Sequence, residues 1–588
     1  MQKRVADALV VVLAIALPAR HLWPLDGGFY VDWPNHEWIV GYFGAFFRAH
    51  HTMPLVLNTT TAGGIAVPVF YGNLLYPALG VFSSVLSAGL VIRLGAILMF
   101  ALQFGLVSHA LHRISVPRYL ARICGCLVIW EIYPLTNLYN RAAVVEFFAT
   151  AALVCGVSAM VVLFHAETRR ERTRYAAGAM LALTFAAGSH PITAMYAVPL
   201  FVLLAPVFWW LLRDDATRRI QIVKALAPWL VTAVICVLPW LLAAREYSNV
   251  MVIRSSAADV TVSKGWDDFS NRMSPLPHDP HIIPGKPLAE INTPYLDAQI
   301  SIPLLVVFLA LGVLAIVVAR RRSRAPAIVF AISLTFFAFF TWLSVSTTGY
   351  RLFPKIFVMI QYAYRAVTYE NLSLLLGIFL LAMTLRPIQD LQTLLSRRAI
   401  NAVASAMLLL AGIGVIIKWD HIAAVKTVGN NPHIISRQHD RRTYVNLPKT
   451  YYGLNAYSTD TLVLKTIPEG QNLDVHAQSF KIETDSKFGD PKPMKLDFAK
   501  PTWVMTDVLS FPWSRLLLDG WPIDMRAHYD QLALLVPPGP HTVTTDFVPP
   551  PSWRALRTIS LVLLFLWCGF AVVEGFLSLR RRGESVSR

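Results

Sequence analysis

Long apolar runs are the feature that most constrains the fold of this chain. They recur along most of its 588 residues, and each approaches the roughly 20 residues that an α-helix needs to cross a bilayer. Only 15% of the residues are charged, whereas a typical soluble domain carries about 25%. The sequence therefore predicts an α-helical polytopic membrane protein.

Twelve runs qualify as membrane spans, and the basic clusters between them indicate their orientation. We expect the first run to be a retained anchor, because no small-x-small cleavage site precedes Pro24 and many spans follow. If all twelve runs cross the membrane, the Lys and Arg clusters fall on one side, which the positive-inside rule makes cytoplasmic. The net charge of +17 is thus a topology signal and does not indicate a nucleic-acid partner. The predicted spans are 5–23, 86–109, 119–137, 142–165, 175–189, 191–212, 224–243, 299–319, 325–345, 370–386, 399–417 and 554–579.

This orientation places the long polar segments on the extracytoplasmic side. The largest segment, 418–553, holds short runs bounded by Pro, Gly, Asn and Asp, as strands are. The runs are Thr461–Ile467, Ser479–Glu483, Thr502–Thr506 and Gln531–Val536. We therefore predict a transmembrane domain at 1–417 with a first outer loop at 24–85, an extracytoplasmic β-sandwich at 418–553, and a final helix with a basic cytoplasmic tail at 554–588.

The first outer loop carries Asp32, His36 and Glu37 directly after the first span. Ionisable groups at a membrane boundary are costly to desolvate and often functional. A partly desolvated Asp32 could act as a general base on a hydroxyl group. Alternatively, Asp32-Trp33-Pro34 is an ordinary helix N-cap followed by an early proline.

Three further groups are candidates for a polar site. Glu146 lies about one turn inside an apolar run, so it either forms a structural ion pair with Arg141 or lines a substrate site. His190, at a turn between two spans, has a structural or a functional role. Arg365 follows Gln361 in an aromatic segment and suits the phosphate of a lipid carrier, or else is an interfacial snorkelling arginine.

No metal or cofactor is expected. His278-Asp279-Pro280-His281 lacks a third set of ligands, and the sequence contains no Walker loop, dinucleotide fingerprint or nucleophile elbow. Trp513 and Trp521 in the outer segment are either sugar-stacking platforms or core and edge residues of the sandwich.

The layout and four short motifs resemble a known superfamily. The first loop, Tyr30-Val-Asp32-Trp-Pro-Asn-His36, resembles that of the GT-C polytopic glycosyltransferases, and Ile360–Arg365 is similar to a Gln-aromatic-x-aromatic-Arg element of their bacterial members. Leu518-Asp-Gly-Trp521 and Leu535–His541 are similar to the outer domain of the bacterial YfhO-like group, in which a Trp precedes the Asp-Gly pair.

This resemblance implies a glycosyltransferase of the bacterial cytoplasmic (inner) membrane. It would move a sugar, with inversion, from a polyprenyl-phosphate-linked donor to a lipid, glycan or protein acceptor on the extracytoplasmic face. Asp32 would be the general base, and Arg365 would hold the donor phosphate. The remaining substrate-binding residues would be His36, Glu37, Arg141, Glu146, His190 and Gln361.

Two other functions remain open. A transporter or flippase for a lipid-linked glycan would place charged residues across the membrane midplane. A non-catalytic membrane scaffold would bind glycans through the outer domain.

Overall fold

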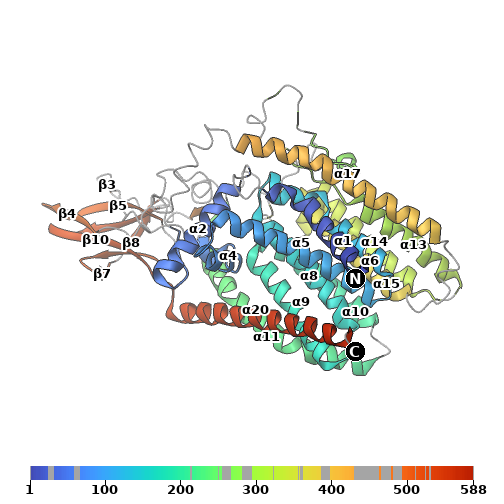
Figure 1. Cartoon of the computed structure of the whole chain (residues 1–588). Helices are drawn as coiled ribbons and strands as arrows, with labels where there is room; N and C mark the ends of the chain where they lie inside the picture. Colours follow the sequence, from blue (N-terminus) through green and yellow to red (C-terminus); the bar gives the residue numbers. More distant parts are fainter. Residues whose placement is uncertain are drawn as a thin grey trace.

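The computed structural model combines a bundle of long helices with a strand-rich region. It describes residues 2–23, 29, 32–57, 67–211, 215–248, 251–253, 267–280, 282, 286, 295–321, 323–354, 357, 360, 362–385, 397–429, 462–464, 478–480, 493–509, 512–523, 525–528 and 531–586. The strands gather at one end of the bundle, and both chain termini lie away from them (Figure 1). We call the end of the bundle near the strands the strand end, and the other end the opposite end.

Each of the twelve predicted spans is helical. The helices are α1 (Gln2–Ala19, continued by η1, Arg20–Leu22), α5 (Ala88–Arg113), α6 (Arg118–Ile129), α8 (Val144–Phe164), α9 (Arg169–Ser189), α10 (Pro191–Leu211), α11 (Ala216–Ser248), α13 (Ile302–Arg321), α14 (Ala325–Val345), α15 (Val367–Leu385), α17 (Arg397–Gly429) and α20 (Pro551–Val586). Among the described residues, nine helices are long and apolar enough to cross a membrane, or ten if a bent pair counts as one span. The apolar part of α1 is short, and α9 begins with charged turns, which explains the lower number.

The bent pair corresponds to the predicted span 119–137. Helix α6 ends at Ile129, and a second segment, α7 (Ile132–Leu135) with the π-helix η2 (Thr136–Asn140), continues at an angle of 44°. Pro134 explains the break, because it cannot donate a hydrogen bond to the carbonyl of Trp130 and its ring would collide with that group. The break directs η2 and the residues after it toward the site described below.

Helices α8 and α15 form the centre of the bundle. Each is about 89% buried over its apolar stretch, whereas α11 and α20 are only 17% buried. Helix α8 packs against α5 and α9, α15 packs against α13 and α14, and α11 packs against α9 and α20. The peripheral helices therefore present the apolar surface that a bilayer would cover.

The first loop forms its own helical layer. Helix α2 (Trp33–His50) packs against α4 (Leu75–Ser83), with the short α3 (Val67–Phe70) between them in sequence. Trp38, Tyr42 and Phe43 of α2 are buried. Helices α2 and α4 lie between the bundle and the strands (Figure 1).

The strand-rich region consists of two four-stranded sheets. One has the order β4 (Met494–Phe498), β10 (Gly539–Phe547), β6 (Ser514–Leu518) and β7 (Trp521–Pro522); the other has β3 (Gln478–Phe480), β5 (Thr502–Leu509), β9 (Gln531–Val536) and β8 (Met525–His528). All pairings are antiparallel except β3 with β5. Leu516 and Val543 from the first sheet and Val504 and Leu534 from the second share one buried core, so the predicted β-sandwich is confirmed.

One predicted strand belongs elsewhere. The run 461–467 contains β2 (Leu462–Leu464), but this strand pairs with β1 (Met251–Ile253) and not with either sheet. The alternating pattern of a strand does not specify its partner, and this partner lies about 200 residues away in sequence.

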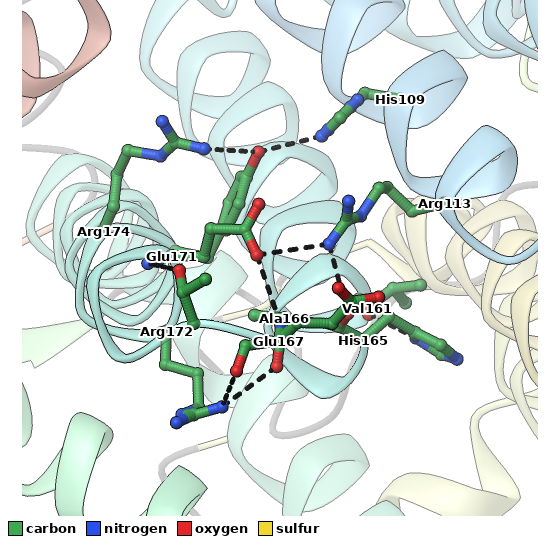
Figure 2. A network of polar contacts seen from close by, with 11 residues as sticks. His109, Arg113, Val161, His165, Ala166, Glu167, Glu171, Arg172 and Arg174 are labelled. Atoms are coloured by element: carbon green, nitrogen blue, oxygen red, sulfur yellow. Dashed lines mark hydrogen bonds and ion pairs between the residues drawn. The ribbon is translucent and has the colours of Figure 1, made fainter. Parts of the chain in front are cut away.

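A network of polar contacts joins α5, α8 and α9 at the opposite end (Figure 2). Arg113 donates to the carbonyl oxygen of His165 at 3.2 Å and to the Glu171 carboxylate at 3.4 Å. Glu574, late in α20, pairs with Arg170 at 2.9 Å. These contacts place the start of α9 beside the C-terminal part of α20, and so away from the strands.

Candidate active site

Asp32 occupies the N-cap position directly before α2 but does not use its carboxylate there. Its carbonyl oxygen accepts the N–H of His36 at 3.1 Å, and its own N–H donates to the carbonyl oxygen of Arg141 at 3.2 Å. The side chain makes no capping hydrogen bond, and Pro34 lies in the first turn. The N-cap interpretation is therefore right about the position of Asp32 and wrong about the task of its carboxylate.

Arg141 and Glu146 form a buried ion pair beside this aspartate. The Nη1 of Arg141 lies 3.0 Å from Oε2 of Glu146 and donates to Oδ1 of Asn137 at 2.8 Å. The other Glu146 oxygen, Oε1, accepts from the hydroxyl of Tyr133 at 3.1 Å and from Nδ2 of Asn137 at 3.2 Å. Because every charged atom named here has a partner, the cluster is rigid as well as buried.

Arg365 approaches the same carboxylate from another helix. It lies in η6 (Ala363–Ala366), which leads into α15. Its Nε is 3.8 Å from Glu146 Oε2 and has no hydrogen-bond partner, while its Nη1 donates to the carbonyl oxygen of Ile360 at 2.9 Å. Two guanidinium groups thus face the Glu146 carboxylate, and the Nε of Arg365 is left as an unused donor for an anion.

The environment of Asp32 alters its acidity. Asp32 is partly buried, and loss of water raises the pKa of its carboxyl above the ordinary value; Arg141 and Arg365 oppose this rise. Glu146 adds to it. A carboxylate that is poorly hydrated binds a proton more readily than an exposed one.

Two predicted histidines are buried and neutral. The Nδ1 of His36 shares a hydrogen bond of 2.8 Å with the hydroxyl of Tyr76, and burial lowers the pKa of His36 to about 3. The Nδ1 of His190 shares one of 2.8 Å with the hydroxyl of Thr193, and burial lowers the pKa of His190 to about 3 as well. Glu146 is the strongest charged neighbour of His190, so His190 belongs to the cluster.

The structure places the remaining predicted residues less centrally. Glu37 accepts a hydrogen bond of 3.0 Å from the indole of Trp33. The side chains of Glu37 and Arg93 both lie close to Gly89 of α5. Gln361 lies outside the described residues. Within the part of the chain that the structure describes, no three His, Cys, Asp or Glu residues could hold a metal ion together.

Sequence reasoning missed Tyr133 and Asn137 as site residues. Both contact Glu146, and both are at most 1% exposed. The spacing of four residues from Tyr133 to Asn137 and from Asn137 to Arg141 was the available signal, because such residues share a helix face.

Comparisons with known proteins identify no family. No protein family matches the sequence, and no curated protein does either. Among solved structures, the chain is similar to the crystal structure of ArnT from Cupriavidus metallidurans bound to undecaprenyl phosphate, with 13% sequence identity and a TM-score of 0.34. The likeness covers 74% of this chain and 77% of that one. At this TM-score the likeness assigns neither a residue nor an activity, so the function is argued from the site.

Proposed function

We propose that this chain is an inverting membrane glycosyltransferase of the GT-C type. It moves a sugar from a polyprenyl-phosphate-linked donor to an acceptor hydroxyl on the extracytoplasmic face of a bacterial inner membrane. The observation that carries the proposal is that the Asp32 carboxylate makes no helix-capping bond. Two hydrogen bonds fix the backbone of Asp32, and its carboxylate lies near two buried arginines.

Asp32 acts as the general base in this proposal. Its carboxylate accepts the proton of the acceptor hydroxyl while the acceptor oxygen attacks the anomeric carbon of the sugar. The bond between that carbon and the phosphate oxygen breaks, and the polyprenyl phosphate leaves with the electron pair. A raised pKa suits this role, since a base that binds a proton more strongly removes it more effectively once ionised.

Arg365 holds the donor phosphate. Its Nε has no hydrogen-bond partner, because the nearest Glu146 oxygen, at 3.8 Å, is beyond hydrogen-bond distance. A phosphate oxygen would supply the missing acceptor, and the Arg365 guanidinium would stabilise the charge on the leaving group. Arg141 keeps Glu146 in position, while Glu146 reduces the repulsion between the two arginines.

Donor binding tests the assignment of Arg365 separately from the chemistry. We expect Arg365→Gln to raise the Kd of the purified protein for undecaprenyl phosphate about tenfold to a hundredfold, the range for loss of a charged hydrogen bond. Asp32→Asn should bind it as the wild type does. Arg351→Gln, at a nearby exposed arginine, is the control, and an equal loss in this variant would show a general charge effect in place of a site.

A further inference from the structure

The strand-rich region presents one tryptophan to solvent. Trp521 is 79% exposed. It follows the turn Asp519-Gly520, in which both residues have positive φ angles of 51° and 84°, the conformation of a tight two-residue hairpin. The turn joins β6 to β7, and Trp521 lies directly opposite Leu518. The hairpin therefore holds the indole at the edge of the sheet, where it is open to solvent.

This position is not that of a membrane-interface anchor. Trp513, just before β6, packs against Trp553 of α20 with the ring centroids 4.8 Å apart. Strand β6 then rises about 16 Å, and β7 lies within the strand-rich region, apart from the helices (Figure 1). Tryptophan combines a large apolar ring with a polar N–H group, and it is enriched where proteins contact other molecules.

A polar pair lies at the turn that precedes Trp521. Asp519 Oδ2 is 2.7 Å from Nδ1 of His541, and Oδ1 accepts the backbone N–H of Thr542 at 2.7 Å. The side chain of Asp519 is nevertheless 48% exposed, and each oxygen keeps a lone pair for another donor. The two bonds hold the carboxylate still, which lowers the entropy cost of binding to it.

The sheet register brings these groups to one face. Val543 pairs with Leu518, and Leu518 pairs with Trp521. His541 stands two residues before Val543 on β10, and alternate residues of a strand share a face. His541 and Trp521 therefore belong to the face of the sheet that carries Val543 and Leu518, but both lie beyond the buried core, with Asp519 at the turn.

We propose that Trp521, Asp519 and His541 form a binding site for a water-soluble saccharide. One apolar C–H face of a pyranose ring would stack on the indole, while a ring hydroxyl donates to Asp519. A sugar combines an apolar face with hydroxyl donors, which matches this pairing of an aromatic with a fixed acceptor. The carboxylate disfavours phosphate and nucleic acid. The proposal does not depend on the transfer reaction proposed above.

Fluorine NMR of the full chain tests the site. The protein, labelled with 5-fluorotryptophan and held in lipid nanodiscs, would be titrated with gluco-, manno-, galacto- and chito-oligosaccharides. The resonance absent from Trp521→Phe identifies Trp521. We expect at least one oligosaccharide to shift this resonance. The same series should be repeated with a polyprenyl-phosphate sugar in the bilayer.

Affinities of variants for the active oligosaccharide complete the test. Trp521→Ala should raise its Kd about tenfold, the loss expected for one aromatic stack, and Trp521→Phe should stay close to wild type. Leu535→Ala, at an apolar position that is 40% exposed, is the control and should change nothing. The proposal fails if no oligosaccharide shifts the Trp521 resonance, if only the lipid-linked sugar does, or if Trp521→Ala binds like the wild type.

Discussion

The backbone N–H of Asp32 donates to the carbonyl oxygen of Arg141 at 3.2 Å. This bond ties the N-cap residue of α2 to the segment before α8, although the two lie more than 100 residues apart. Arg141 therefore positions the candidate base through its main chain and holds Glu146 through its side chain. The site depends on this one residue to align two separate segments of the chain.

Asp32→Ala should not destabilise the protein. Burial raises the pKa of Asp32 in the folded state, so its ionised form opposes folding at pH values above that pKa. Since the side chain makes no capping bond, its removal loses no such contact, and thermal unfolding in detergent at pH 7 should give an equal or higher Tm. The control is Thr168→Ala: this side chain does cap α9 by accepting from the Glu171 N–H at 3.1 Å, and its loss should cost about 1 kcal/mol. A lower Tm for Asp32→Ala than for Thr168→Ala would contradict this account.

The rate of transfer should rise with pH through the pKa of Asp32. Only the ionised carboxylate can accept a proton, so kcat/KM falls as Asp32 becomes protonated on the acid side. Because burial raises this pKa above 3.8, the midpoint of the acid limb should lie above that value. Arg141 lowers the pKa of Asp32, so Arg141→Met should move the limb to still higher pH. A limb that stays in place in this variant would show that another group controls it.

Removing one member of the Arg141–Glu146 pair should destabilise the protein more, per residue changed, than replacing both members together. Each single change, Arg141→Met or Glu146→Leu, leaves a buried charge without its main partner and should destabilise the protein by about 3–5 kcal/mol. The double variant should lose less stability than the sum of the losses in the two single variants, because neither charge of the pair remains. Thermal unfolding of the three variants measures this coupling. Strict additivity would mean that the two side chains do not interact.

Gly44→Ala should disrupt the packing of α2 on α4. A Cβ at Gly44 would lie 2.6 Å from the carbonyl carbon of Ser83 and 2.7 Å from its oxygen, and backbone atoms cannot move aside cheaply. We expect a loss of about 1–3 kcal/mol, as for other overpacked contacts. Gly105→Ala is the matched control within a helix, since its Cβ would meet nothing within 4 Å. Tm values from thermal unfolding decide between them, and equal values would show that α2 and α4 do not pack this closely.

Apolar run length and basic clusters predicted the helices well, because both reflect the bilayer directly. They could not predict the bend after Ile129, where Pro134 competes with a continuous apolar pattern. Strand predictions were weaker: β4, β6, β7, β8 and β10 had been missed. All of these strands except β10 have five residues or fewer, and several hold Pro, Gly or charged residues that weaken the alternating pattern.

Candidate site residues were partly predictable from the cost of burying charge. Glu146 stood out because a carboxylate inside an apolar helix needs a partner, and Arg141 was close enough in sequence to suggest one. Pairs from distant segments gave no such signal. Lys418 of α17 and Asp297, which lies before α13, form a fully buried ion pair, and nothing in either local sequence indicates the other. Such pairings depend on the tertiary arrangement of the helices.

Sugar transfer by Asp32→Asn tests the central proposal most directly. Membranes containing wild type or variant would receive radiolabelled polyprenyl-phosphate sugars, with Asp268→Asn as the control, since Asp268 is an exposed N-cap of α12 (Phe269–Arg272) whose side chain also makes no capping bond. We predict that wild type and Asp268→Asn consume a donor, and that Asp32→Asn does so about 10²–10⁴ times more slowly, as for loss of a general base. Donor consumption by Asp32→Asn at the wild-type rate would contradict the proposal.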